Sequence, residues 1–166
     1  MQTSSRARVA LAAAAALTFA AASHAQADPR ADEGALRYRQ SLMEAVSGDM
    51  AALANLMKYR LTVPGAAAVH ADGLAARAKL VALAFERKVT DGATDAEPGI
   101  WEKPAEFQQS IEKFQAETAR LAEIAKGGDP VAVGEQIRAT GKTCGGCHDT
   151  FRKPKEESFK RKGGGS

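Results

Sequence analysis

The sequence predicts an all-α protein, an antiparallel up-down-up-down four-helix bundle. Three observations carry this prediction. The chain after residue 28 is rich in Ala, Leu, Glu, Lys, Arg and Gln, which are good helix formers, and clusters of β-branched residues are scarce. Apolar residues recur every three or four positions in four separate stretches. All but one of the connections between them are short, and short links favour antiparallel neighbours.

Residues 1–27 have the pattern of a cleaved export signal. Two arginines give a positive start, residues 9–22 form an Ala-rich apolar run, and residues 25–27 (Ala-Gln-Ala) fit a small-x-small cleavage site. The apolar run is too short to span a bilayer, so we expect no membrane anchor. We expect a mature chain that begins at Asp28 and is exported to the periplasm.

The bundle is expected over residues 28–154, and a prolonged apolar seam marks its first helix. This helix is predicted over residues 32–60, because the Pro-Gly pair at 64–65 ends it. A second helix is predicted over residues 66–88. The first seam contains Leu36, Arg39, Met43, Val46, Met50, Leu53 and Met57. The predicted buried face of the second helix has smaller side chains and contains Val69, Gly73, Ala76, Leu80 and Leu83.

Turn residues separate the second half of the bundle into two further helices. Residues 89–100 contain Asp-Gly and Pro-Gly pairs and are predicted to form a loop. A third helix is predicted to begin near Glu102 or Pro104 and to run to about Lys126, and the glycines at 127–128 are a C-cap signal. A fourth is predicted over residues 129–153, with Asp as N-cap and Pro at its first position. We expect the charged and Gly-rich residues 155–166 to be disordered.

Composition excludes several classes of function. Lys and Arg number 23 against 20 Asp and Glu, a net charge of +3 that argues against a dedicated nucleic-acid binder. Two cysteines and three histidines are too few ligands for a zinc or iron–sulfur centre built from several of them. We therefore expect no nucleic-acid partner.

The chemistry is concentrated in residues 144–148, which have the sequence Cys-Gly-Gly-Cys-His. This spacing indicates covalent attachment of one c-type haem. Two thiols one helical turn apart can each form a thioether to a vinyl group, and the adjacent His148 directs its imidazole at the iron. Gly145 and Gly146 remove side-chain bulk at the porphyrin edge. The sequence thus predicts Cys144 and Cys147 as anchors.

The cysteine pair has two other interpretations. A thioredoxin-like redox dithiol has the same spacing, but it normally begins a helix that follows a strand, whereas this pair lies late in a predicted helix. A structural disulfide is the other alternative in an oxidising compartment.

Several segments resemble the class II cytochromes c, the family of cytochrome c′ and its low-spin relatives. The resemblance covers residues 32–153, and it implies a four-helix bundle with covalent haem c. The matching segments are Tyr-Arg-Gln-Ser-Leu-Met at 38–43, Pro-Gly-Ile-Trp at 98–101 and the haem helix at 141–153.

The resemblance implies roles for further residues. His148 would be the proximal iron ligand. Arg152, four residues later, would lie close to the proximal imidazole and favour its neutral form. Arg39 matches a family arginine near a haem propionate, which would explain an arginine within an apolar seam.

Met43 separates two functions, because it matches the family position that faces the distal side of the haem. A methionine there is the sixth ligand in the low-spin relatives, whereas in cytochrome c′ the residue packs over a five-coordinate iron. We expect the first: a periplasmic electron carrier, not an enzyme, with iron held by His148 and Met43. The alternative is a five-coordinate haem that binds nitric oxide or carbon monoxide. Met50 and Met57 are expected to be core residues.

The expected partners follow from these functions. An electron carrier would meet redox partner proteins, for which Lys142, Lys153 and Lys155 could form a basic rim. The alternative function would bring a small gas to the haem. The resemblance also implies a homodimer through the first two helices.

Overall fold

A computed structural model describes residues 28–159, and the predicted export signal lies outside this range. The helices are α1 (Pro29–Lys58), α2 (Ala66–Ala78), α3 (Val81–Ala84), α4 (Gly99–Glu102), α5 (Pro104–Gly127) and α6 (Pro130–Phe151). A 3₁₀ turn, η1 (Lys155–Glu157), follows. Within the described range no strand forms, and the one isolated β-bridge joins Ala96 and Arg152.

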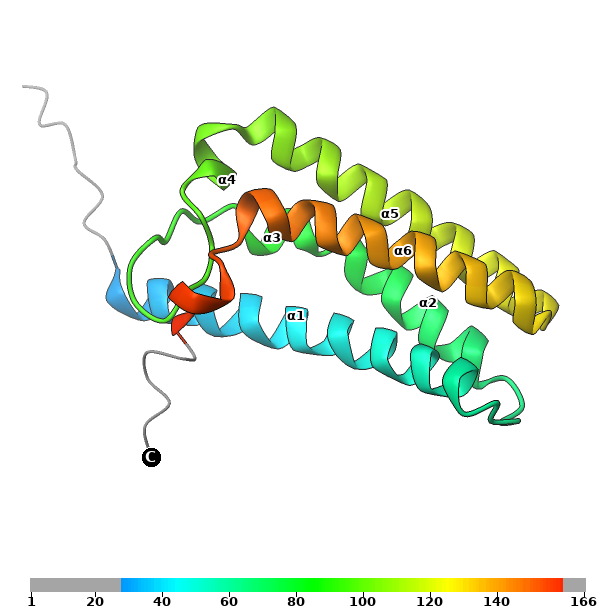
Figure 1. Cartoon of the computed structure of the whole chain (residues 1–166). Coiled ribbons are helices and arrows are strands. Elements are labelled where there is room, and N and C mark those ends of the chain that lie inside the picture. Colours follow the sequence, from blue (N-terminus) through cyan, green and yellow to red (C-terminus); the bar gives the residue numbers. More distant parts are fainter. Residues whose placement is uncertain (1–27, 160–166) are drawn as a thin grey trace, which may run out of the picture.

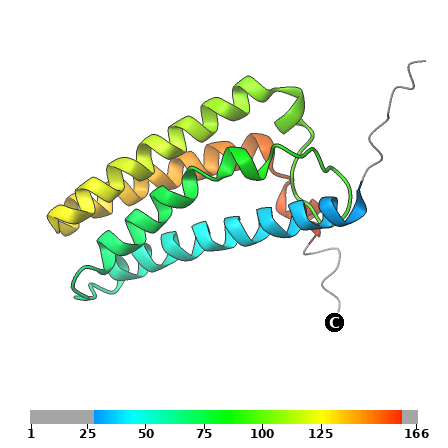
Figure 2. The same cartoon turned by 180° about the vertical axis from the view of Figure 1, so that it is seen from behind.

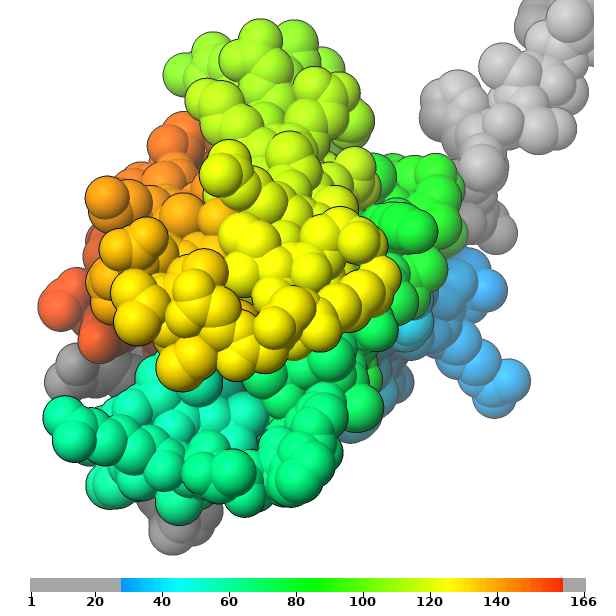
Figure 3. Space-filling model, turned by 90° about the vertical axis from the view of Figure 1, so that its right-hand side faces the viewer, coloured from blue at the N-terminus to red at the C-terminus, as the bar shows by residue number. Residues whose placement is uncertain are grey.

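Four long segments form the bundle and alternate in direction (Figures 1 and 2). α1 and α5 run one way, whereas α2 with α3 and α6 run the other way. α2 packs on α1 and α5, and α6 packs on α5 and α1. The predicted all-α antiparallel four-helix bundle is therefore confirmed. The α1–α2 and α5–α6 connections close one end (Figure 3), while both ends of the described chain lie at the other (Figure 1).

Local signals set most helix ends. The Asp28 side chain caps α1 by accepting from the N–H of Arg30 at 3.0 Å, and the Asp129 side chain caps α6 by accepting from Val131 at 2.9 Å. Each cap precedes a proline in the first turn. α5 ends at Gly128, whose φ of 72° is the left-handed conformation that glycine adopts without strain.

The predicted second helix is wrong in length and in its buried face. The helix is interrupted after Ala78, because the side chain of Gln115 on α5 donates to the Ala78 carbonyl at 3.2 Å. A side chain that occupies a helical carbonyl in this way breaks the backbone ladder. Val69 and Leu83 of the predicted face are 70% and 57% exposed.

The residues that α2 and α3 bury lie one or two positions further along the chain than those predicted. They are Ala71, Leu74, Ala78, Val81 and Ala84.

One apolar cluster runs through the bundle. Its members from α1 include Leu42, Val46 and Leu53. Met43, Met50 and Met57 are only partly buried and pack against the edge of this cluster. The cluster members from the other long helices include Leu74, Phe107, Ile111, Phe114, Leu121, Val133, Ile137 and Phe151.

The prediction of a disordered tail is wrong for residues 155–159. Lys155–Glu157 form the 3₁₀ turn, Ser158 is buried, and the N–H of Phe159 donates to Asp95 at 2.9 Å. The remaining residues, 160–166, lie outside the described range. A search of the described helices finds none with the length and apolar character needed to cross a membrane.

Candidate functional site

Cys144 and Cys147 share one face of α6 because three residues are nearly one helical turn. Both are unpaired thiols, both are half-buried, and both pack against the apolar cluster. This face already contributes Ile137, Thr140 and Phe151 to the interior. The periodicity of the helix therefore directs both thiols into the space between the helices.

The cysteine pair lacks the properties of a redox dithiol. Burial raises the pKa of the Cys144 thiol, and burial together with neighbouring Cys144 raises the pKa of Cys147 to about 11. Reactive dithiols have a lowered pKa and lie at helix N-termini, whereas these thiols lie in the last third of α6. The thiol–disulfide interpretation therefore loses its chemical basis.

His148 follows Cys147 directly and keeps a free imidazole. Within residues 28–159 its ring makes no hydrogen bond, whereas Nδ1 of His70 lies 3.0 Å from the Asp49 carboxylate. Part of the His148 ring is open to solvent, yet its surroundings desolvate it and lower its pKa. The charge of Arg152 lowers this pKa further, and Asp149 opposes the shift. A neutral imidazole is the form that binds iron.

Helix geometry predicts that Met43 on α1 and His148 on α6 lie at the same level of the bundle. A Cβ at Gly134 would lie 4.0 Å from the sulfur of Met57, so these two positions face each other across the antiparallel pair. Fourteen residues back along α1 lead to Met43, and fourteen residues forward along α6 lead to His148. Both steps cover about 21 Å and nearly four full turns, so each side chain keeps the face of its starting residue.

Arg39 is a buried cation that binds backbone carbonyls. Its side chain is 4% exposed; Nε donates to the carbonyl of Ala84 at 2.8 Å, Nη1 to Val89 at 3.2 Å, and Nη2 to Arg87. These bonds use three of the five guanidinium N–H groups and leave one on each terminal nitrogen. Burial lowers the pKa of Arg39, and no carboxylate in the described part of the chain pairs with it.

Aromatic rings surround this guanidinium. It lies 4.9 Å from the ring centre of Phe85 and 5.2 Å from that of Trp101, a cation–π arrangement. The Trp101 indole N–H donates to the carbonyl of Phe85 at 2.8 Å. Phe107 contacts Phe85 and Phe151 edge to face at 5.3 and 5.1 Å. The rings close the end of the bundle at which α6 ends.

Arg152 occupies the C-cap of α6 in an extended conformation. Its backbone N–H donates to the carbonyl of His148 at 3.1 Å, and its guanidinium lies 3.4 Å from the carboxylate of Asp95. The structure thus brings Arg152 to the His148 turn, but its side chain leaves the helix toward the loop before α4.

The donor set fits a haem c. Two half-buried thiols face an apolar interior, a free imidazole adjoins them, and the buried Arg39 lacks the anionic partner that a propionate would supply. A Cβ at Gly145 or Gly146 would meet no atom within 4 Å, so this turn is open. No cluster of three His, Cys, Asp or Glu residues exists in the described range, so these side chains alone form no metal centre.

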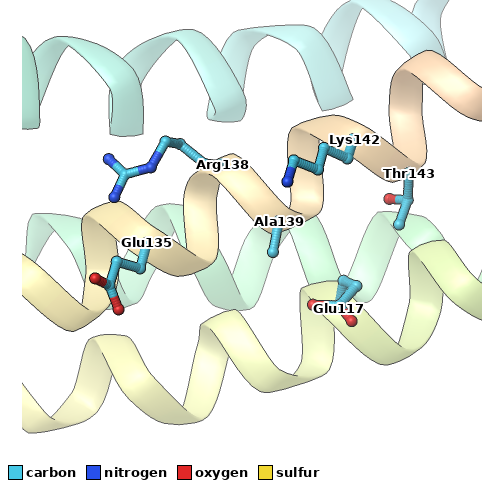
Figure 4. Close-up of a pocket in the computed structure, with 6 residues that line it drawn as sticks. All are labelled: Glu117, Glu135, Arg138, Ala139, Lys142 and Thr143. Carbon is cyan, nitrogen blue, oxygen red and sulfur yellow. The ribbon is translucent and has the colours of Figure 1, made fainter.

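A groove between α5 and α6 lies outside this arrangement. It has a volume of about 390 Å³, and Figure 4 shows that Glu117 of α5 lines it together with residues of α6 that include Glu135, Arg138 and Lys142. Neither cysteine nor His148 lines it. Its mixture of acidic and basic groups suits solvent rather than a porphyrin.

A four-helix bundle with this donor set on its last helix defines a haem c-binding class of protein. Comparison with known proteins specifies the family: the model described as Cytochrome C' matches residues 34–152, and the chain belongs to the cytochrome c′ family. Cytochrome c′ from Pararhodospirillum photometricum is 34% identical over 121 residues, which cover 72% of this chain and 97% of that protein. Cytochrome c′ from Rhodospirillum rubrum is 35% identical over 143 residues, 86% and 95% of the two chains.

Solved structures agree with this assignment. Cytochrome c prime from Shewanella frigidimarina has a TM-score of 0.69 and 28% identity, covering 74% of this chain and 97% of that one. A variant of cytochrome c prime from Alcaligenes xylosoxidans, solved as its nitric oxide complex, has a TM-score of 0.68 and 27% identity over the same shares. The prediction of a class II cytochrome c with one covalent haem c is confirmed, and attachment through Cys144 and Cys147 stays a prediction.

The same comparisons correct the expected function. The prediction of a low-spin electron carrier with Met43 as sixth ligand is wrong, because the matching family and these relatives are cytochromes c′. The structure supplies a physical reason. Met43 packs against the apolar cluster in the same way as Met50 and Met57, so its position is explained by core packing.

The sequence does not reveal the partners of Arg39 or the role of Asp95. The carbonyls that bind Arg39 belong to residues 84–89, about fifty positions away, and no side-chain pattern marks them. Asp95 is one acid among several in the predicted loop. An arginine inside an apolar seam was the only local sign that a buried polar partner exists.

Arg39→Ala should destabilise the holoprotein by about 3 kcal/mol or more, because it leaves three carbonyls without their charged donor. Urea unfolding measures the difference. Arg37→Ala is the matched control on the same helix: its exposed pair with Glu33 should contribute within about 0.5 kcal/mol. Equal effects of the two variants would contradict the role of Arg39 in binding these carbonyls.

Proposed function

We propose that the protein binds nitric oxide or carbon monoxide at a five-coordinate haem iron in the periplasm, with His148 as the proximal ligand. Membership of the cytochrome c′ family carries this proposal, and the packing of Met43 against the apolar cluster agrees with it. Cys144, Cys147 and His148 would hold the haem c, and its iron would supply the chemistry that binds a diatomic gas. The nitric oxide complex of a relative from Alcaligenes xylosoxidans supports the ligand class. No substrate is transformed in this function.

The distal wall on α1 favours a neutral diatomic ligand. Met43 offers only an apolar surface, and its helical neighbours Leu42 and Val46 belong to the core. The polar side chains of this stretch are engaged elsewhere: Arg39 binds carbonyls, and Gln40 donates to Ala93. Distal polarity and hydrogen-bond donors decide which ligand a haem prefers, and this wall offers few donors.

Arg39 and Arg152 are proposed to act on the haem from two sides. Two unused N–H groups on the buried Arg39 can bind a propionate, which would also supply the missing counter-charge. Arg152 contributes positive charge beside the proximal imidazole, as its effect on the pKa of His148 indicates.

We infer that residues 1–27 direct export, in line with their charge and cleavage pattern. Asp28 would then be both the first mature residue and the N-cap of α1. Covalent haem attachment and export agree with one compartment, the periplasm.

The absorption spectrum of the reduced holoprotein tests the proposal. A five-coordinate iron should give a broad high-spin spectrum that shifts when carbon monoxide is added. A sharp low-spin spectrum that carbon monoxide leaves unchanged would show a sixth protein ligand and overturn the assignment.

Met43→Ala should accelerate carbon monoxide binding about tenfold, equivalent to about 1.4 kcal/mol, because a side chain that must be displaced is removed. Stopped-flow mixing measures this rate. Met50→Ala is the control, since it removes the same side chain about 10 Å further along the same seam and should leave the rate unchanged. A similar acceleration in both variants would exclude a distal role for Met43.

We further propose a homodimer formed through the exposed apolar residues of α2 and α3. Val69, Leu80 and Leu83 share the stripe that periodicity marks as buried, yet each is exposed in the single chain. A second copy would cover it. Leu83→Glu should therefore yield a monomer in light scattering coupled to size exclusion, whereas Val131→Glu, an exposed apolar position on α6, should not. A dimer that survives Leu83→Glu would contradict this interface.

A further inference from the structure

The loop before α4 carries a carboxylate that the proposed gas-binding function does not use. Asp95 is only 10% exposed at its side chain. Oδ1 accepts from the N–H of Phe159 at 2.9 Å, while Oδ2 accepts from the Ser158 hydroxyl at 2.8 Å and from Arg152 at 3.4 Å. All three donors belong to residues 152–159, here called the C-terminal segment.

Backbone bonds hold the same two parts of the chain together. The carbonyl of Asp95 accepts from the N–H of Lys153 at 2.8 Å, and the N–H of Glu97 donates to the carbonyl of Phe151 at 3.0 Å. The Lys153 ammonium donates to the carbonyl of Thr94 at 3.2 Å. Figure 1 shows the loop passing beside this segment at the end of the bundle where α6 ends. Asp95 is therefore the side-chain centre of a junction immediately after the haem helix.

Asp95 is charged in this junction. Burial by itself would raise the pKa of its carboxyl, but hydrogen bonds from Phe159, Ser158 and Arg152, together with the Arg152 charge, lower the pKa overall. At neutral pH a buried anion thus faces the guanidinium of Arg152.

We propose that Asp95 is a positioning residue that holds the Arg152 guanidinium and the C-terminal segment at the haem end of the bundle, and thereby sets the charge that the iron experiences. The inference rests on the proposed ligation of iron by His148. The backbone of Arg152 is already tied to the His148 carbonyl at 3.1 Å. Asp95 therefore determines two things: where the Arg152 guanidinium points, and how much of its positive charge is balanced by a nearby negative charge.

The charge has a predictable effect on redox chemistry. While Asp95 is ionised, it compensates part of the Arg152 charge. Asp95→Asn removes this compensation without a large change of volume, so positive charge beside the iron is less balanced. Unbalanced positive charge favours the ferrous over the ferric state, since the two differ by one unit of positive charge.

The midpoint potential of the holoprotein tests the proposal. Asp95→Asn should raise it, Asp95→Glu should restore it toward the wild-type value, and Asp91→Asn should leave it unchanged although it removes the same charge from the same loop. In an Arg152→Gln background the shift caused by Asp95→Asn should fall to less than half. An undiminished shift there, or an equal shift in Asp91→Asn, would overturn the proposal, as would no shift in Asp95→Asn.

Tryptic cleavage after Lys155 gives a readout that does not depend on the axial ligand. Loss of a hydrogen bond to a charged acceptor should increase cleavage of the C-terminal segment about tenfold in Asp95→Asn. Ser158→Ala should also increase cleavage but should move the potential less, because it removes no charge. Unchanged cleavage in both variants would contradict the anchoring role. Ser158→Ala provides this test independently if Asp95→Asn does not fold.

The two proposals fail in different ways. A low-spin spectrum of the wild type that carbon monoxide leaves unchanged would remove the five-coordinate assignment and leave the cleavage results intact. Unchanged potential and cleavage with a normal high-spin spectrum would remove only the role of Asp95.

Discussion

Antiparallel packing of α1 and α6 fixes the register on which the proposed haem site depends, and it brings Met57 on α1 level with Gly134 on α6, where an added Cβ would lie 4.0 Å from the Met57 sulfur. Because both helices advance equally per residue, we expect the same register about four turns further along, which would bring Met43 and His148 to the same level of the bundle. A slip of one residue would rotate Met43 by about 100° away from that face. The proposed proximal and distal roles of His148 and Met43 would thus follow from the way two different helices pack together. The apolar cluster between the helices stabilises the register through burial of its side chains.

Arg39 binds backbone carbonyls at the same end of the bundle. α3 ends there and irregular backbone follows, so the carbonyls of Ala84, Arg87 and Val89 lack helical partners, and a guanidinium with several donors can bind all three. The cost of burying its charge is reduced by the carbonyl dipoles and by the rings of Phe85 and Trp101. Its two unused N–H groups and its missing counter-anion suit a haem carboxylate. One side chain therefore connects the fold of residues 84–89 with the proposed recognition of the cofactor.

The C-terminal segment adds electrostatics to this arrangement. Positive charge from Arg152 and negative charge from Asp95 lie just beyond the haem helix, and both are partly shielded from water. Interactions between charges strengthen as solvent is excluded, so their balance affects the iron more than exposed charges would. A segment that composition predicts to be disordered is thus docked beside the end of α6, because one loop carboxylate accepts hydrogen bonds from three of its donors.

The sequence by itself determined what depends on neighbours along the chain. The helix caps at Asp28 and Asp129 involve groups two residues apart, and Cys144, Cys147 and His148 are arranged by a single helical turn. The tertiary structure decided what depends on distant partners. Gln115 interrupts the second helix, Arg39 takes carbonyls about fifty residues away, and Asp95 docks residues expected to be disordered. The role of Met43 belongs to this second group: its position on α1 follows from periodicity, but a thioether that packs and one that ligates have the same local sequence. Such partners are selected by packing between helices, and no local pattern encodes them.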